Sequence, residues 1–164
     1  LPVAVHNQDE PARGLADATR IHYLGTSMGG HGCLTYAARH PEIPRSVCAF
    51  FPITDFTDWA KQFPKRAEAF AKAHGLSEEA TWAAFPDYSP LLAASAFAIL
   101  PVMLIHGDAD TVVPVHHSQR FAAALRAQGS PVIYHEVRGG THDNNLAILW
   151  QDAILDFFEQ APPR

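Results

Sequence analysis

The sequence predicts an α/β fold in which helices cover both faces of a parallel sheet. Short apolar runs, typical of buried strands, alternate along the chain with longer segments whose apolar residues recur at helical spacing. Each crossover between parallel strands places a helix on one face of the sheet, so this alternation indicates parallel pairing. The chain has 164 residues, enough to bury a core, and residues 1–164 are treated as a single domain.

Four apolar runs are the predicted strands. They cover residues 21–24, 46–51, 102–106 and 132–137. The first run stops at Gly25, the second at Pro52 and the third at Gly107. Glycine and proline are the strongest local signals that a regular element ends, so these residues set the expected strand boundaries.

Three longer segments are the predicted helices. From Met28 the apolar residues recur at helical spacing until Pro41, which cannot continue a helix. A second helix is expected at 114–128, because proline stands at its start and glycine follows its end. The last helix is expected at 145–160, where apolar residues form a stripe along one side. Residues 1–19 are polar and mixed, so a loop or the remnant of a frayed helix is expected there.

Residues 53–98 differ from the rest of the chain in composition and in hydrophobic pattern. They are rich in aromatic residues and contain several short helical patterns, with Asp55 and Ser77 in positions typical of N-caps. The segment is too long for a simple crossover between two strands. We therefore predict a helical cap inserted at 53–98 within the single domain.

Composition and charge exclude several classes of function. The net charge is −5 with histidine neutral, and no cluster of Lys and Arg offers a footprint for nucleic acid. No apolar run approaches 18 residues, so no membrane-spanning helix and no membrane partner are expected. The first 17 residues lack the pattern of a signal peptide, and the compartment is left open. Cys33 and Cys48 lie in apolar surroundings, where buried free thiols are expected and a disulfide is the alternative.

The strongest chemical signal is the segment 25–30, Gly-Thr-Ser-Met-Gly-Gly, which we call the elbow. A G-x-S-x-G pattern between a strand and a helix holds its serine in a strained turn at the tip of the sheet. Small residues two before and two after Ser27, Gly25 and Gly29, are expected to avoid steric clash there. Ser27 is the predicted nucleophile. The N–H of Met28, at a helix N-terminus, is the predicted oxyanion-hole donor.

A serine nucleophile needs a base, and the chain has ten histidines. His142 lies in a Gly-Gly-Thr-His loop directly after the last strand, which places it at the same sheet edge as Ser27. His106 ends a strand, where a packed or hydrogen-bonded side chain is expected. His116 and His117 stand in the first turn of a helix and are expected to face solvent. His31 follows the elbow, and an exposed position is favoured for it over a place in a pocket. His40, at the other end of the same helix, is also expected to be exposed. His6, His22, His74 and His135 have no local context for catalysis.

The base in turn needs an acid to orient it and to stabilise the imidazolium. Asp110 lies in the loop after the third strand, at the same edge as Ser27 and His142. Asp108 is the competitor, and its alternative role is that of a turn former directly after Gly107. Asp143 neighbours His142 too closely for the required geometry and is better explained as an N-cap of the last helix.

Three segments together carry a family resemblance: GTSMGG around Ser27, HGDADTVVP around Asp110 and GGTH ending at His142. They resemble the elbow, acid loop and histidine loop of α/β-hydrolases, in the chain order Ser, Asp, His typical of that fold. The combination is most similar to the prolyl-oligopeptidase and dienelactone-hydrolase branch, and the resemblance covers about residues 18–160. It implies the triad Ser27, Asp110 and His142. No metal is expected, because no HExxH or comparable ligand pair appears, and no cofactor is expected, because the chemistry needs only the triad, the oxyanion donors and water.

The resemblance is incomplete at the N-terminus. Only one predicted strand precedes the elbow, whereas the family places its elbow after the fifth strand of a sheet of about eight. The fold is therefore expected to be an α/β-hydrolase fold that lacks its N-terminal strands, with an exposed sheet edge at 21–24. We expect this chain to be the C-terminal part of a longer hydrolase. A missing N-terminal segment or self-association would then cover the edge.

Three functions fit these observations. The first is a serine hydrolase that cleaves small carboxylic esters through an acyl-enzyme, favoured by the aromatic cap, although ordinary packing explains those aromatic residues equally well. The second is a peptidase of the prolyl-oligopeptidase type, which uses the same triad on a peptide substrate. The third is an inactive fragment or binding module that keeps the triad but lacks a complete oxyanion hole.

Overall fold

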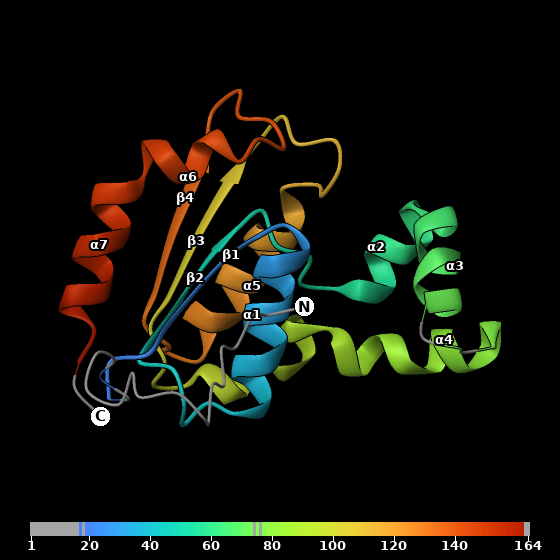
Figure 1. The fold of residues 1–164 in the computed structure, drawn as a ribbon, viewed down its shortest axis with the longest axis horizontal. Helices are drawn as coiled ribbons and strands as arrows, with labels where there is room; N and C mark the ends of the chain where they lie inside the picture. Colours follow the sequence, from blue (N-terminus) through green and yellow to red (C-terminus); the bar gives the residue numbers. More distant parts are fainter. Residues whose placement is uncertain (1–16, 18, 74, 76, 163–164) are drawn as a thin grey trace, which may run out of the picture.

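The computed structural model describes residues 17, 19–73, 75 and 77–162. The loop or helix remnant predicted for residues 1–19 lies almost entirely outside the described residues. Within them, strands and helices follow the predicted order along the chain. The fold class predicted from the sequence, a parallel sheet flanked by helices, is confirmed (Figure 1).

The described residues form a four-stranded sheet in the order β1-β2-β3-β4, and every neighbouring pair is parallel. The strands are β1 (His22–Thr26), β2 (Ser46–Phe50), β3 (Val102–Gly107) and β4 (Val132–Val137). Their bounds agree with the predicted ones to within two residues, and those of β4 are identical. Because the strands are parallel, their carboxyl ends meet at one edge of the sheet, at the top of Figure 1.

Helices pack on both faces of this sheet. On one face lie α1 (Met28–Arg39) and α5 (His116–Ala127), where Leu34, Phe121 and Leu125 are fully buried against the strands. On the other face lie α6 (Asn145–Leu149) and α7 (Gln151–Gln160), where Ile154 and Phe157 pack on β2 and β3. This sandwich holds the strand ends, and therefore the loops that follow them, in fixed relative positions.

The prediction of one continuous helix over 145–160 is wrong. The segment divides at Trp150, whose backbone (φ −106°, ψ 9°) lies outside the helical region. Its ring packs on His135 of β4, with ring centroids 4.4 Å apart. Figure 1 shows that α6 and α7 run in different directions as a result. The turn lets α7 lie along the sheet while α6 stays beside the strand ends.

Five helical segments lie between β2 and β3: α2 (Phe56–Gln62), α3 (Pro64–Ala73), α4 (Glu78–Ala84), η1 (Phe85–Tyr88) and η2 (Pro90–Phe97). The first three project to one side of the sheet in Figure 1. The predicted N-caps are present, since Asp55 accepts a hydrogen bond from Asp58 N–H and Ser77 accepts one from Ala80 N–H. By contrast, η2 packs against α1 and α5 through Phe97.

Cys33 and Cys48 are both buried and form no disulfide, as the apolar surroundings indicate. Burial raises the pKa of the Cys48 thiol to about 12 and also raises the pKa of Cys33, so neither thiol supplies a thiolate near neutral pH. Among the helices of the described residues, none has the length and apolar character needed to cross a bilayer.

Candidate active site

Ser27 stands in the tight turn between β1 and α1. Its backbone has φ 53° and ψ −122°, a region that residues with a side chain rarely adopt. Two hydrogen bonds hold the turn: Ser27 N–H donates to the Phe50 carbonyl at 2.9 Å, and the Ser27 carbonyl accepts from His31 N–H at 2.9 Å. The strained conformation is therefore held by one hydrogen bond to the sheet and one to the helix. In this conformation the Ser27 hydroxyl lies at the edge of the sheet.

Of the two elbow glycines predicted to avoid steric clash, only one is crowded in the structure. A Cβ on Gly25 would lie 2.5 Å from the backbone carbonyl of Gly29, so the prediction was right for Gly25. No atom lies within 4 Å of the place where a Cβ on Gly29 would stand, so it was wrong for Gly29. The second crowded position is Gly30, where a Cβ would lie 3.0 Å from the Gly25 carbonyl oxygen. The close approach therefore joins the end of β1 to the first turn of α1.

The loop after β4 brings His142 to Ser27. The distance from His142 Nε2 to Ser27 Oγ is 2.9 Å, and that from His142 Nδ1 to Asp110 Oδ2 is 2.7 Å. The carboxylate can only accept, so Nδ1 carries the hydrogen and Nε2 offers its lone pair to the serine hydroxyl. The three side chains that the sequence predicts as a triad are therefore joined in one hydrogen-bonded chain.

Asp110 is buried, with a side chain that is 0% exposed. Its Oδ1 accepts hydrogen bonds from the N–H groups of Val112 and Val113 at 2.8 and 2.9 Å. Burial by itself raises the pKa of Asp110, but hydrogen bonds from His106, Val113, His142 and Val112 outweigh it and lower the pKa to about 2. The carboxylate facing His142 therefore stays ionised across the working range of a hydrolase.

Asp108, the competitor for the acid role, lies elsewhere. Its Oδ1 accepts a hydrogen bond from Gly139 N–H at 2.6 Å, and its side chain is exposed. This contact joins the loop after β3 to the loop after β4. Two backbone bonds strengthen the junction, since Ala109 N–H donates to Gly140 and Asp108 N–H donates to Val137. Asp108 is thus a turn and loop former, as its alternative role predicts.

Phe51 is a part of the site that the sequence analysis missed. It follows β2, is fully buried, and has a positive φ of 35°. Its ring packs against the His142 imidazole, with centroids 4.3 Å apart. A bulky residue in this conformation is strained, and such strain concentrates at functional sites. The only local signal was Pro52, which indicates a turn but not the contact with His142.

Two histidines expected at the surface are buried. His31 is 6% exposed, and its Nδ1 lies 2.9 Å from the Ile53 carbonyl oxygen. His117 is 0% exposed, and its Nδ1 accepts hydrogen bonds from the N–H groups of Thr54 and Asp55, both at 3.4 Å. The solvent-facing interpretation was wrong for both, because the chain that leaves β2 covers them. Such coverage comes from residues distant in sequence.

These two histidines predict a loss of stability in mild acid. Burial lowers the pKa of His31 to about 4 and that of His117 to about 4, so both must remain neutral in the folded state. A histidine with a lowered folded pKa stabilises the fold fully above about pH 6.5 and loses that contribution as the pH falls towards 4. We expect the free energy of unfolding to fall by about 2 kcal/mol for each histidine between pH 7 and 4.5.

Urea unfolding of the wild type and of His31→Gln at pH 7 and 4.5 tests this expectation. The variant is compared with the wild type at pH 7 first, which separates its lost hydrogen bond from its pH dependence. His31→Gln should lose about 2 kcal/mol less than the wild type on acidification. Asp110 does not contribute in this window, because its stabilisation is lost only below its ordinary pKa of 3.8. Equal losses in the two proteins would contradict the expectation.

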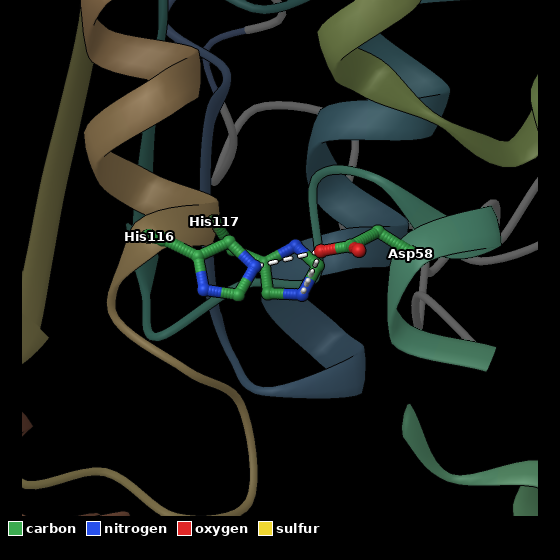
Figure 2. Close-up of side chains that lie close together, drawn as sticks. All are labelled: Asp58, His116 and His117. Atoms are coloured by element: carbon green, nitrogen blue, oxygen red, sulfur yellow. Dashed lines mark hydrogen bonds and ion pairs between the residues drawn. The ribbon is translucent and has the colours of Figure 1, made fainter. Parts of the chain in front are cut away.

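A polar cluster links α2 to the start of α5, beside the loop that carries Asp110. Figure 2 shows its members, Asp58, His116 and His117. Asp58 Oδ2 lies 2.7 Å from His116 Nε2 and 3.9 Å from His117 Nε2. Arg120 extends the cluster, with its guanidinium 3.2 Å from Asp55 Oδ2. The cluster thus ties α2 to the start of α5 through charged and polar contacts.

The ligand atoms of Asp58, His116 and His117 lie within 4.8 Å of one another, a spacing that could hold a metal ion. The hydrogen bonding of His117 argues against such a site. Its Nδ1 accepts two backbone N–H groups, so its Nε2 carries the ring hydrogen and has no lone pair for a metal. The positive guanidinium of Arg120, 3.7 Å from Asp58 Oδ2, opposes a further cation there. An ion-paired tether fits this chemistry better.

The sequence model of the prolyl oligopeptidase family matches residues 10–162. The chain belongs to this family. The family resemblance predicted from the three segments around Ser27, Asp110 and His142 is therefore confirmed.

Individual relatives are distant and longer than this chain. An uncharacterized secreted protein of Arthroderma benhamiae is 29% identical over 145 residues, which are 88% of this chain and 15% of that protein. The S-formylglutathione hydrolase of Mus musculus is 30% identical over 130 residues, 77% of this chain and 43% of the mouse protein. The chain therefore spans less than half the length of these two relatives.

A solved structure extends the likeness to the fold. The puromycin-hydrolyzing peptidase of Mycobacterium tuberculosis superposes with a TM-score of 0.72 and 28% sequence identity, over 89% of this chain and 22% of that one. Proteins similar to this chain thus include an S-formylglutathione hydrolase and a puromycin-hydrolyzing peptidase. Family membership alone does not choose between the two substrate classes.

Proposed function

We propose that this chain carries the catalytic triad of a serine hydrolase that cleaves carboxylic esters through an acyl-enzyme, with Ser27 as nucleophile, His142 as base and Asp110 as acid. The observation that carries the proposal is the unbroken chain of short hydrogen bonds from Ser27 Oγ through His142 to Asp110. Nucleophile, base and orienting acid within hydrogen-bond reach are the signature of an activated serine.

The reaction follows from these positions. Ser27 Oγ attacks the ester carbonyl carbon while His142 Nε2 takes the hydroxyl proton, and Asp110 stabilises the imidazolium that forms. The N–H of Met28, the first residue of α1, has no acceptor within its helix and is a donor for the developing oxyanion. When the bond from carbon to the alkoxide oxygen breaks, His142 returns the proton to the leaving alcohol. Water then releases the acid by the same steps.

The choice of ester over peptide rests on leaving-group chemistry. An amine must be protonated as it leaves, whereas an alkoxide leaves more readily, so an ester demands less of the oxyanion hole. Met28 supplies the one donor that we assign in this chain, and the loss of a donor typically costs a factor of about 10² to 10³ in rate. The likeness to a puromycin-hydrolyzing peptidase favours the second candidate, a peptidase that uses the same three residues.

We also propose that residues 53–98 act as a helical cap on the single domain 1–164. Its aromatic rings pack mainly on one another, with Phe56, Phe85 and Trp59 buried in a cluster of their own. Trp59 Nε1–H donates to the Val112 carbonyl at 3.1 Å, next to the acid. At the other end of the segment, η2 packs against α1 and α5. The cap is thereby coupled to the loop that carries Asp110.

A fluorophosphonate probe, which reacts with activated serines, tests the proposed nucleophile. We expect stoichiometric labelling at Ser27, its abolition in Ser27→Ala, and undiminished labelling in Ser95→Ala, which removes an exposed serine of η2. A folded protein that does not label would point instead to the inactive binding module. For a protein that labels, the ratio of kcat/KM on matched acyl esters and aminoacyl anilides then separates esterase from peptidase.

A further inference from the structure

Asp110 lies between two serine–histidine pairs. On one side is the pair Ser27 and His142. On the other side, His106 Nδ1 lies 2.7 Å from Ser118 Oγ, and His106 Nε2 lies 3.5 Å from Asp110 Oδ2. The second pair is sealed from solvent, because the side chains of His106 and Ser118 are both 0% exposed. It therefore cannot meet a substrate and can act only through Asp110.

The hydrogen bonds of His106 define its tautomer. Its Nε2 lies 2.8 Å from the Val113 carbonyl oxygen, which can only accept, so Nε2 carries the hydrogen. Nδ1 consequently accepts the hydroxyl hydrogen of Ser118. The Nε2–H group is directed first at Val113 O, and Asp110 Oδ2 at 3.5 Å receives a longer, shared contact.

Two contacts couple the His106 ring to Asp110. The N–H of Val113 donates to Asp110 Oδ1, while the carbonyl of Val113 accepts from His106 Nε2–H. His106 therefore positions the Asp110 carboxylate indirectly, through the backbone of Val113. In addition, Nε2 of the ring lies 3.5 Å from Asp110 Oδ2 in a fully buried position, and this contact helps to lower the pKa of Asp110. Packing alone would be served by an apolar side chain, such as those at the other buried positions of β3 from Val102 to Ile105.

We propose that His106, held by Ser118, is a positioning residue that fixes the orientation of Asp110 and thereby that of His142. The inference rests on the proposed function, since it assigns a role within that triad. His106 takes no proton in the reaction. It keeps the carboxylate aligned with His142 Nδ1 when the imidazolium forms, which is when the alignment matters most for the rate.

Two variants separate the two ends of the ring. His106→Asn keeps an amide at the Nδ1 end facing Ser118 and loses the Nε2–H group, whereas His106→Gln can return an N–H to the Nε2 position. We expect kcat on an ester to fall about ten- to a hundredfold in His106→Asn with little change in KM, and to recover largely in His106→Gln. Leu125→Ala is the matched control, because Leu125 is fully buried on α5 in the core away from the triad.

A pH profile distinguishes positioning from a loss of packing. The acidic limb of kcat/KM reports the base of the free enzyme. A carboxylate that is less well aligned stabilises the imidazolium less, so the limb should move to lower pH in His106→Asn. The low-field proton resonance of His142 Nδ1–H should weaken in parallel. Leu125→Ala should lower the free energy of unfolding and leave the limb and the resonance unchanged.

Each outcome decides the matter. A folded His106→Asn with wild-type kcat and an unmoved acidic limb overturns the inference and leaves the proposed function intact. If that variant does not fold, Ser118→Ala, which frees the Nδ1 end, must show a smaller loss of kcat and a shift of the limb in the same direction, or the inference fails. If the wild type neither labels at Ser27 nor hydrolyses esters, the proposed function fails and the inference fails with it.

Discussion

Replacement of His142 by alanine is expected to reduce kcat on an ester by a factor approaching about 10⁶, as large an effect as the loss of the nucleophile itself. Its Nε2, 2.9 Å from Ser27 Oγ, is positioned to remove the serine proton, and its Nδ1 is held by a carboxylate that stays ionised. Without the base, the serine hydroxyl is a weak nucleophile near neutral pH. Single-turnover hydrolysis of an activated ester measures the loss at the acylation step.

The control for His142→Ala is a histidine outside the triad on the same part of the chain. His135 lies on β4, and its ring packs on Trp150. His135→Ala should retain most of the turnover while the free energy of unfolding falls through lost packing. The His142 side chain is only 20% exposed and packs on Phe51, so His142→Ala should also lose some stability, and urea unfolding checks that the variant is folded where turnover is measured. Substantial turnover in a folded His142→Ala would mean that another group serves as the base.

The hydrogen-bonded arrangement of Ser27, His142 and Asp110 could be predicted from the sequence because its geometry is set by local features. Gly25, Pro52 and Gly107 each mark the carboxyl end of a strand, and parallel strands bring these ends to one edge of the sheet. A serine, an acid and a base that follow different strands must then lie near one another. The predicted strand bounds agree with the observed ones to within two residues for the same reason, because the glycine or proline that ends a strand is adjacent to it in the sequence.

The residues that support the triad could not be predicted, because their positions depend on contacts between distant segments. His117 is buried because residues 54 and 55, which follow β2, direct their N–H groups at its ring. A first-turn helical position alone indicated solvent. Phe51 contacts His142, which lies 91 positions later in the sequence, and its backbone has a strained positive φ. Pro52 indicates a turn at this place but predicts neither the strain nor the contact. The helix over 145–160 divides at Trp150 because its ring packs on β4, which a helical apolar stripe does not reveal.

The elbow shows the same distinction within six residues. Both Gly25 and Gly29 belong to the G-x-S-x-G pattern, and the pattern treats them alike. The folded chain does not, because a Cβ at Gly25 would lie within 2.7 Å of three backbone atoms of residues 29 and 30, whereas a Cβ at Gly29 would meet nothing within 4 Å. The pattern identifies the turn, but the packing of β1 on α1 decides which glycine the turn requires.

Gly25→Ala and Gly29→Ala are therefore expected to have opposite effects. In Gly25→Ala the new methyl group meets backbone rather than a flexible side chain, so the start of α1 must move away from β1, and Ser27 lies between them. A displacement of about 1 Å at a reacting group costs about a hundredfold in rate, and we expect at least this loss of kcat. The free energy of unfolding should fall by about 3 kcal/mol or more through overpacking.

Gly29→Ala should retain labelling at Ser27 and should be as stable as the wild type or more so, since alanine is favoured over glycine inside a helix by about 0.5 to 1 kcal/mol. Urea unfolding and the rate of fluorophosphonate labelling, measured on both variants side by side, compare the two positions directly. If Gly29→Ala proved the more damaging change, the packing of β1 against the first turn of α1 would not be what holds Ser27 in its strained conformation. Another constraint, such as the hydrogen bond from Ser27 N–H to Phe50, would then have to hold it.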